Sequence, residues 1–285
     1  MYSRRRNRSN LFSRKRSLDT LKAKSVEHMD KLRGLVKRGL RALGYQVRGT
    51  RYCPRQLQEP ALLRRLEFDD VVCRRLFEFG PELTFIQVGA FDGITKDPLR
   101  KYIDKCGWRG VVIEPQPSAA NQLRELYRNN NRIIILQAAL DGKSGRRTLY
   151  TVDAPRAPAW AGGLASFRRE TIVKHSDLIP GLETMILESA VDCVTFDEVL
   201  EVVKRKQIDL LQIDTEGADG YILSLFPLNR VQPAIVHWEV KHLNTSEREA
   251  CLDRLAAFAY RFAPSGDEDM LAVLNDQPAK VGSPS

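Results

Sequence analysis

The chain has 285 residues, 43% of them hydrophobic, which is enough for one large α/β domain with an extension or for two small domains. It carries a net charge of +9, and it has no stretch of about eighteen apolar residues and no apolar segment after its basic start, so we expect neither a transmembrane helix nor a secretory signal. The five cysteines are scattered without a CxxC pair, which fits neither a zinc site nor a disulfide framework and predicts reduced thiols in a cytoplasmic protein.

The positive charge is confined to the N-terminal segment. Residues 1–48 contain fifteen Lys and Arg residues against three acids, whereas residues 49–285 contain thirty basic residues and 33 acids, a net charge of −3. Residues 1–16 are predicted to be disordered, and residues 18–43 are predicted to form a basic amphipathic helix. This helix could pack on the main domain, act as an organelle-targeting peptide, or dock on a partner or an anionic membrane, which would place the protein at a membrane periphery.

Residues 49–82 are predicted to form a helical lead-in to the main domain. A stripe of apolar residues at helical spacing predicts a helix over residues 62–79, and Gly80-Pro81 marks its end. The side chains expected on its buried face are Leu62, Leu63, Leu66, Val71, Val72, Leu76 and Phe77.

From residue 83 onward, short apolar segments alternate with helical patterns. Near-continuous apolar strands separated by helices predict a parallel sheet that is covered by helices on both faces. Residues 148–187 contain several Pro and Gly residues and are expected to form a long irregular insertion that covers a site. The predicted strands are 85–88, 111–113, 133–136, 209–213 and 234–238, and helices are predicted between them at 118–127 and 218–225.

Four predicted strands end in a glycine or an acid, at Gly89, Glu114, Asp214 and Glu239. Ligands bind outside the carboxyl ends of the strands in an open parallel sheet, so these four ends predict a site. The turn after the first strand lacks the GxGxxG pattern, which argues against a dinucleotide. Glu114 is placed to accept both hydroxyls of a ribose, and residues 138–141 are suited to flank an adenine. The pattern therefore predicts a pocket for an adenosine attached to a group other than pyrophosphate.

Five strings of the sequence carry a resemblance to a known family. They are FIQVGAFDGITKDP (85–98), VVIEPQP (111–117), QAALDGKSG (137–145), LLQIDTEGAD (210–219) and PAIVHWEVKHL (233–243). With these strings the chain resembles the FkbM family of methyltransferases from about Leu83 to Leu274. The resemblance implies a class I methyltransferase fold with a mostly parallel seven-stranded sheet over residues 83–285, S-adenosylmethionine as methyl donor, and a hydroxyl acceptor that is often a sugar.

The resemblance also assigns roles to residues at the predicted strand ends. The methionine part of the donor would lie against Gly89, Asp92 and Gly93, the ribose against Glu114, and the adenine against Ala139 and Leu140. Asp97 could bind the donor or could instead cap a helix predicted at residues 98–105. Ser166 and His175 fall in the insertion and are expected to contact the acceptor. The further donor-binding residues expected are Gln87, Phe91, Pro115 and Asp214.

Methylation of a hydroxyl requires a general base or a metal ion that removes its proton. Asp214, Glu239 and His242 lie at the ends of two predicted strands beside the donor and are the catalytic candidates. Asp214 could instead hold the ammonium group of the donor. Asp214 together with Glu239 could also bind Mg²⁺, because hard cations favour oxygen ligands.

The predicted function is O-methylation of a sugar, glycan or small metabolite. A catalytically silent adaptor that docks through the basic N-terminus is an alternative of another class, which the joint presence of Gly89, Asp92, Glu114 and Asp214 disfavours. Only the N-terminal arginines favour an RNA methyltransferase, and the net charge of −3 over residues 49–285 offers no long phosphate track, so we expect no nucleic-acid partner. The sequence predicts no particular oligomeric state.

Overall fold

The computed structural model describes residues 66–204 and 207–275. The predicted disordered segment, the basic amphipathic helix and residues 49–65 of the lead-in lie outside the described residues.

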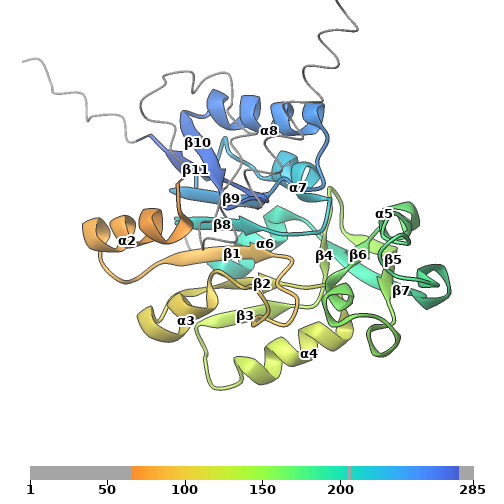
Figure 1. The fold of residues 1–285 in the computed structure, drawn as a ribbon. Helices are drawn as coiled ribbons and strands as arrows, with labels where there is room; N and C mark the ends of the chain where they lie inside the picture. Colours follow the sequence, from red (N-terminus) through yellow and green to blue (C-terminus); the bar gives the residue numbers. More distant parts are fainter. Residues whose placement is uncertain (1–65, 205–206, 276–285) are drawn as a thin grey trace, which may run out of the picture. The chain divides into compact units, whose positions relative to one another are not determined.

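A seven-stranded sheet forms the centre of the described part of the chain (Figure 1). Its strand order is β10-β11-β9-β8-β1-β2-β3. Five neighbouring strands, β9, β8, β1, β2 and β3, pair in parallel, whereas β11 is antiparallel to both of its neighbours. This arrangement confirms the mostly parallel sheet and the class I fold. The bounds are β1 Thr84–Val88, β2 Arg109–Ile113, β3 Ile133–Leu136, β8 Leu210–Ile213, β9 Ile235–Glu239, β10 Tyr260–Ser265 and β11 Asp269–Leu274.

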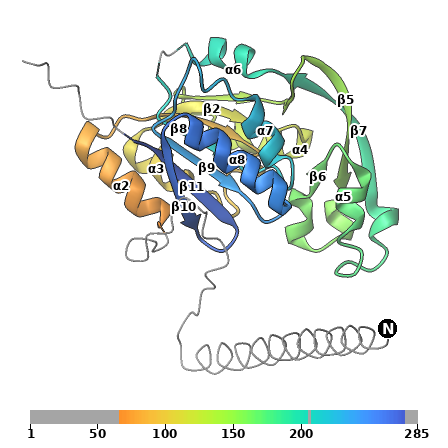
Figure 2. The ribbon, with the colours of Figure 1, turned by 90° about the horizontal axis from the view of Figure 1, so that it is seen from above.

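Helices cover both faces of this sheet, as predicted (Figure 2). One apolar core joins the sheet to α6, α7 and α8, and a second core on the other face joins it to α2, α3 and α4. No helix among the described residues is long and apolar enough to cross a membrane. The bounds are α2 Phe68–Phe79, α3 Arg100–Cys106, α4 Pro117–Leu126, α6 Phe196–Val203, α7 Asp219–Leu225 and α8 Thr245–Ala257.

The helix predicted over residues 62–79 begins later, at Phe68. The backbone N–H of Leu66 donates to the carbonyl of Pro264, so the chain before α2 is bound to β10 and is extended at residue 67. Phe68 and Val72 are buried against the main sheet. Phe77 was expected on the buried face but is 93% exposed, because the helix presents Phe68 and Val72 rather than Phe77 to the sheet.

The insertion predicted over residues 148–187 is less irregular than expected. It contributes β6 and parts of β5 and β7 to a second, four-stranded sheet in the order β4-β7-β5-β6, which lies beside the edge of the main sheet in Figure 1, and it carries several short helices. A small core of its own includes Val152, Leu164, Ile172 and Leu182. The bounds are β4 Ala139–Leu140, β5 Gly145–Val152, β6 Ala165–Ser166, α5 Arg169–Val173 and β7 Ile186–Val194, with 3-10 helices at Ala154–Arg156, Ala159–Gly163 and Leu182–Met185.

Strands β1 and β8 approach each other very closely where they end. Gly89 has a φ of +78°, and a Cβ atom on it would lie 1.8 Å from the carbonyl oxygen of Asp214. The N–H of Gly89 donates to Ile113 on β2, and the N–H of Asp214 donates to Val88 on β1. These contacts hold the ends of three adjacent strands at one level, which places Glu114 and Asp214 on either side of the first turn.

We expect Gly89→Ala to lower the free energy of unfolding by about 2–4 kcal/mol, because the new Cβ would collide with the backbone of β8 and the backbone would be strained at positive φ. Urea denaturation of the purified variant measures this change. Gly163→Ala is the matched control: a Cβ there meets no atom within 4 Å, and we expect a change below about 0.5 kcal/mol. Equal stability of the two variants would contradict the close approach of the strands.

Candidate active site

A cavity of about 220 Å³ opens at the carboxyl ends of β1, β2 and β8, where the sequence predicted a site. Ends of main-sheet strands form one side of it, and residues of the insertion form the other. The predicted site residues that line it are Gln87, Gly89, Phe91, Asp97, Glu114, Pro115, Ala139, Leu140, Ser166 and Asp214. Five predicted residues are not among those that line it, namely Asp92, Gly93, His175, Glu239 and His242.

Glu114 is a buried acid in the wall of the cavity, with an exposed fraction of 3%. Its Oε2 accepts the N–H of Phe91 at 2.8 Å, and its Oε1 accepts the N–H of Gln116 at 2.9 Å. Burial raises the pKa of Glu114 to about 7, although the two hydrogen bonds favour the ionised form. Each oxygen keeps a second lone pair, so the carboxylate can still accept hydroxyl groups from a bound ligand.

The turn after β1 is built by residues that the sequence assigned to the donor. Phe91 and Gly93 both have positive φ, and a Cβ on Gly93 would lie 2.6 Å from Leu123 Cδ2. The carboxylate of Asp92 accepts the N–H groups of Ile94 and Thr95 within the same turn. Asp92 and Gly93 therefore shape the turn, and their contact with a donor stays a prediction.

Gln87 and Asp97 line the cavity, and each of them has a buried acceptor oxygen without a hydrogen bond in the part of the chain that the structure describes. Gln87 Nε2 donates to Asp97 Oδ1 at 3.3 Å, and the same oxygen accepts the N–H of Leu99. The helix expected at residues 98–105 begins at Arg100 with Leu99 as its N-cap and without a side-chain cap, so Asp97 holds the turn before α3 and is not its N-cap. Gln87 Oε1 and Asp97 Oδ2 are buried and make no hydrogen bond to any described residue. Buried acceptors without a donor are costly, so this pair is suited to an ammonium group of a ligand.

The opposite end of the cavity is an apolar slot. Ala139 and Leu140 of β4 line it together with Phe167 of the insertion. The guanidinium carbon of Arg147 lies 3.9 Å from the centre of the Phe167 ring. Arg147 Nη1 is 2.7 Å from Asp141 Oδ2, so this ion pair positions Arg147 against the ring. An apolar slot of this kind can take a flat purine.

The loop after β8 brings another acid, Glu216, into the cavity wall. Asp219 has an exposed fraction of 1% and accepts the N–H groups of Thr215 and Gly217, at 2.9 and 3.0 Å. These two bonds fold the loop back, and Glu216 takes a left-handed conformation with a φ of +53°. We did not predict Glu216 from the sequence, although it stands only two residues after Asp214 in the string IDTEGAD.

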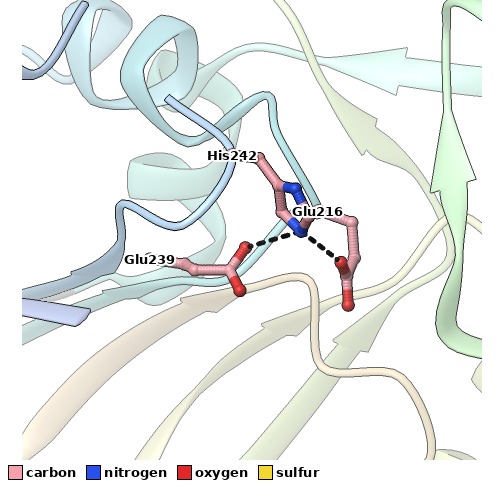
Figure 3. Close-up of side chains that lie close together, drawn as sticks. All are labelled: Glu216, Glu239 and His242. Atoms are coloured by element: carbon pink, nitrogen blue, oxygen red, sulfur yellow. Dashed lines mark hydrogen bonds and ion pairs between the residues drawn. The ribbon is translucent and has the colours of Figure 1, made fainter. Parts of the chain in front are cut away.

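Glu216, Glu239 and His242 converge at the edge of the cavity (Figure 3). His242 Nε2 lies 3.1 Å from Glu216 Oε2 and 3.8 Å from Glu239 Oε2. The loop that carries His242 is fixed at its end by a reciprocal capping box between Asn244 and Glu247 at the start of α8. The predicted catalytic residues Glu239 and His242 are thus brought together, and Glu216 connects them to the cavity.

Acidic side chains are concentrated around this cluster. Burial and the neighbouring charges of Asp214 and Glu216 raise the pKa of Glu239 to about 9. Desolvation by the surrounding protein atoms raises the pKa of Asp214 as well, and the negative charge of Asp219 is the next largest cause. The side chain of Asp214 is nevertheless exposed to solvent within the open cavity. Burial alone would raise the pKa of Glu216, but the hydrogen bond and charge of His242 lower it overall. The site is therefore suited to a cationic ligand.

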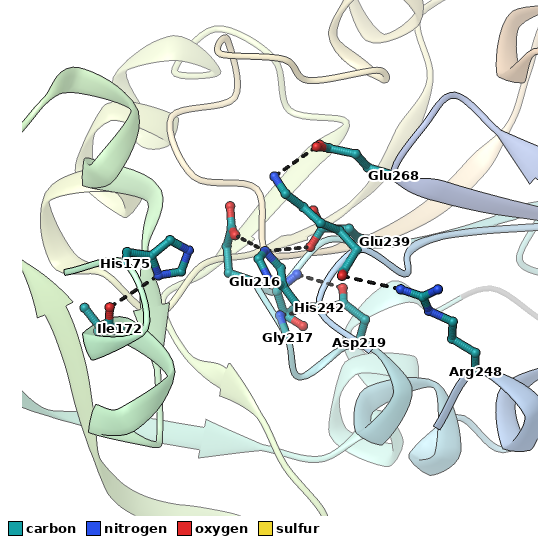
Figure 4. A network of polar contacts seen from close by, with 11 residues as sticks. Ile172, His175, Glu216, Gly217, Asp219, Glu239, His242, Arg248 and Glu268 are labelled. Atoms are coloured by element: carbon teal, nitrogen blue, oxygen red, sulfur yellow. Dashed lines mark hydrogen bonds and ion pairs between the residues drawn. The ribbon is translucent and has the colours of Figure 1, made fainter. Parts of the chain in front are cut away.

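His175 connects the cluster to the insertion. Its ring centre is 6.0 Å from that of His242 and 6.1 Å from that of Trp160, whose side chain is half-exposed and lines the cavity. Figure 4 shows His175 on the insertion, across from Glu216 and His242. The predicted acceptor residues Ser166 and His175 thus lie on the side of the cavity that the insertion forms.

The chain belongs to the FkbM methyltransferase family, because residues 87–277 match the methyltransferase FkbM domain. No curated protein matches the sequence significantly.

Several solved methyltransferases are similar to this chain. Methyltransferase FkbM from Methylobacillus flagellatus KT is 12% identical over 68% of this chain, with a TM-score of 0.44, and the match covers 44% of that protein, so this chain spans less than half of its length. The precorrin-6y C5,15-methyltransferase from Geobacter metallireducens GS-15 is 9% identical over 80% of this chain and 93% of its own, with a TM-score of 0.35. The O-methyltransferase from Bacillus cereus in complex with SAH is 10% identical over 75% and 84%, with a TM-score of 0.35.

We expect Asp219→Ala to lower the free energy of unfolding by about 2–3 kcal/mol, because two backbone N–H groups lose a buried acceptor that organises the loop of Glu216. Urea denaturation measures the loss. Asp253→Ala, on the exposed face of α8, is the control and should change the stability by less than about 0.5 kcal/mol. If Asp219→Ala were as stable as this control, Asp219 would not hold the loop.

Proposed function

We propose that the protein is an S-adenosylmethionine-dependent O-methyltransferase that acts on a hydroxyl group of a sugar, glycan or small metabolite. The observation that carries this proposal is the arrangement of the cavity: the buried acid Glu114 and the apolar slot lie at one end, and the cluster of Glu216, Glu239 and His242 lies at the other. A nucleoside binds at the first end, and a hydroxyl can lose its proton at the second.

The cavity residues fit the parts of the donor. Glu114 would accept the ribose hydroxyls, and the slot formed by Leu140 and Phe167 would take the adenine. Gln87 Oε1 and Asp97 Oδ2, which lack a partner among the described residues, would accept the N–H groups of the methionine ammonium. The donor supplies an electrophilic methyl group on a positively charged sulfur. An acid-rich pocket stabilises the positive charge of the donor sulfur before transfer. This interaction is lost after transfer, because the thioether of the product is uncharged.

The acceptor would enter between the insertion and the end of β9. Trp160 offers a half-exposed aromatic surface there, and Ser166 offers a hydroxyl for hydrogen bonding. The side chains align the acceptor oxygen with the methyl group, which is the main contribution that an enzyme makes to this displacement. The hydroxyl proton is removed at the cluster of Glu216, Glu239 and His242, and this need for a proton acceptor favours O-methylation over transfer to a group that carries no proton to lose.

One feature of the proposal, the basic N-terminal segment, lies outside the cavity. Residues 1–48, with their excess of positive charge, would provide peripheral contact with an anionic membrane for a cytoplasmic enzyme.

A catalytically silent adaptor with the same fold is the alternative function. Such an adaptor would not need an acid with open lone pairs in the donor pocket. Calorimetry with S-adenosylmethionine separates the two functions, because only the enzyme must bind the donor.

Glu114→Ala should weaken the binding of S-adenosylmethionine by about 1.5–3 kcal/mol, the usual contribution of hydrogen bonds to a charged group. Isothermal titration calorimetry on the folded variant measures this difference. Glu125→Ala, which removes an acid whose side chain is 72% exposed on α4, is the control and should bind the donor as the wild type does. Unchanged affinity in the Glu114 variant would show that the ribose binds elsewhere.

His242→Ala should reduce turnover by about 10²–10⁴-fold, because the cluster that accepts the hydroxyl proton is lost, and should leave donor affinity almost unchanged. Single-turnover methyl transfer to a panel of glycans and nucleotide sugars, combined with calorimetry, measures both quantities. Glu249→Ala, an exposed position on α8, serves as the control for general effects. Near-wild-type turnover of His242→Ala would remove His242 from the mechanism and transfer its role to Glu239 or Asp97.

A further inference from the structure

Three potential metal ligands converge from two segments of the chain, the loop after β8 and the end of β9 with the turn that follows it. Glu216 lies in the loop after β8, Glu239 is the last residue of β9, and His242 precedes α8. His242 Nε2 is 3.1 Å from Glu216 Oε2 and 3.8 Å from Glu239 Oε2, and one ligand atom from each residue lies within 4.8 Å of the others (Figure 3). Ligand atoms bound to one ion at about 2.1 Å are about 3–3.5 Å apart, so small side-chain movements would complete such a site.

The carboxyl group of Glu239 indicates that a positive charge binds at this cluster. Its side chain is 9% exposed, and its Oε2 makes no hydrogen bond to any described residue while it faces His242 (Figure 3). A buried carboxylate oxygen without a donor is strongly unfavourable. The neighbouring cation Lys241 forms an ion pair with Glu268 at 3.0 Å, and it acts on Glu239 through its charge without a hydrogen bond to Glu239 Oε2.

The chemical type of the ligand atoms indicates which metal ion fits the site. A set of two carboxylates and one imidazole favours Zn²⁺ or Mn²⁺, whereas Mg²⁺ prefers oxygen ligands and retains most of its water. Asp214, Asp219 and Glu239 form a second group of acids, but both oxygens of Asp219 already accept backbone N–H groups. The Mg²⁺ site predicted from the sequence at Asp214 and Glu239 is therefore less well supported than a site that contains His242.

We infer that Glu216, Glu239 and His242 bind a divalent transition-metal ion, Zn²⁺ or Mn²⁺, at the acceptor side of the cavity. Three protein ligands leave positions open, as in catalytic metal sites. Glu216 is the ligand on the cavity side, with 35% of its side chain exposed, so the open positions face the cavity.

The role of this ion rests on the proposed function. A cation beside the acceptor hydroxyl lowers the pKa of that hydroxyl. With the ion bound, Glu216, Glu239 and His242 serve as its ligands, so the cluster promotes loss of the hydroxyl proton through the ion rather than by accepting the proton itself. The proton passes to water, the acceptor oxygen forms the new bond to the methyl carbon, and the electron pair of the broken C–S bond returns to the sulfur of the donor. The charges balance, because the donor loses its positive charge as the proton is released.

The test uses the full chain without an affinity tag, treated with chelator and dialysed, and Mn²⁺ alone as the probe, because the cysteines of the chain compete less for Mn²⁺ than for Zn²⁺. Electron paramagnetic resonance of free Mn²⁺ gives the stoichiometry and the dissociation constant. We expect one site per chain, and we expect Glu239→Gln and His242→Ala each to weaken it by about 100-fold or more. Glu249→Gln, which changes an exposed acid on α8 outside the cluster, is the matched control and should bind Mn²⁺ as the wild type does.

Absence of Mn²⁺ binding at about 1 mM, confirmed by calorimetry with Zn²⁺, would overturn the inference. So would binding that is abolished by Asp214→Asn but unaffected by His242→Ala, because this pattern places the ion among the acids alone. His242→Ala removes an imidazole that is 21% exposed, so it provides a folded variant if Glu239→Gln does not fold. Calorimetry with S-adenosylmethionine on the same metal-free sample keeps the two proposals separate: donor binding without metal binding overturns only the metal site, and metal binding without donor binding overturns only the methyltransferase function.

Discussion

The close approach of β1 and β8 is the constraint on which the rest of the site depends. Only a glycine at position 89 leaves room for the carbonyl of Asp214, and the hydrogen bonds at this point hold the ends of β1, β2 and β8 at one level. Because the strands are parallel, the residue that follows each of them emerges at the same edge. Glu114 and Asp214, which are 100 positions apart in the sequence, therefore face one cavity.

The same geometry concentrates negative charge in a small volume. Asp214, Glu216 and Glu239 lie close together with Asp219 behind them, and Lys241 is bound to Glu268 rather than to any of them. Like charges at this spacing are unfavourable unless positive charge or protons compensate them. A cationic donor at one end of the cavity and a metal ion at the other would each compensate part of this charge, so ligand binding and the electrostatics of the site are closely connected.

The insertion completes the cavity from the other side. Its strands add a second sheet with a core of their own, so Phe167, Ser166 and Trp160 are presented by ordered structure rather than by a loose loop. Phe167 is further held by Arg147, which is itself paired with Asp141. The ends of the main-sheet strands and the residues of the insertion thus form two sides of one cavity.

The sequence by itself determined the sheet and its strand ends, because apolar strands and the residues that follow them are local features with a fixed period. The family was indicated separately, by the resemblance of five sequence strings. Glu114 and Asp214 could be predicted from the strand ends. The helix start at Phe68 could not, because the preceding residues bond to Pro264, far away in the sequence. Glu216 escaped prediction for a similar reason: its direction depends on a left-handed turn that the buried Asp219 imposes. Only the tertiary structure decided that Glu216, Glu239 and His242 meet, since the convergence of loops from different strands depends on packing and not on any local pattern.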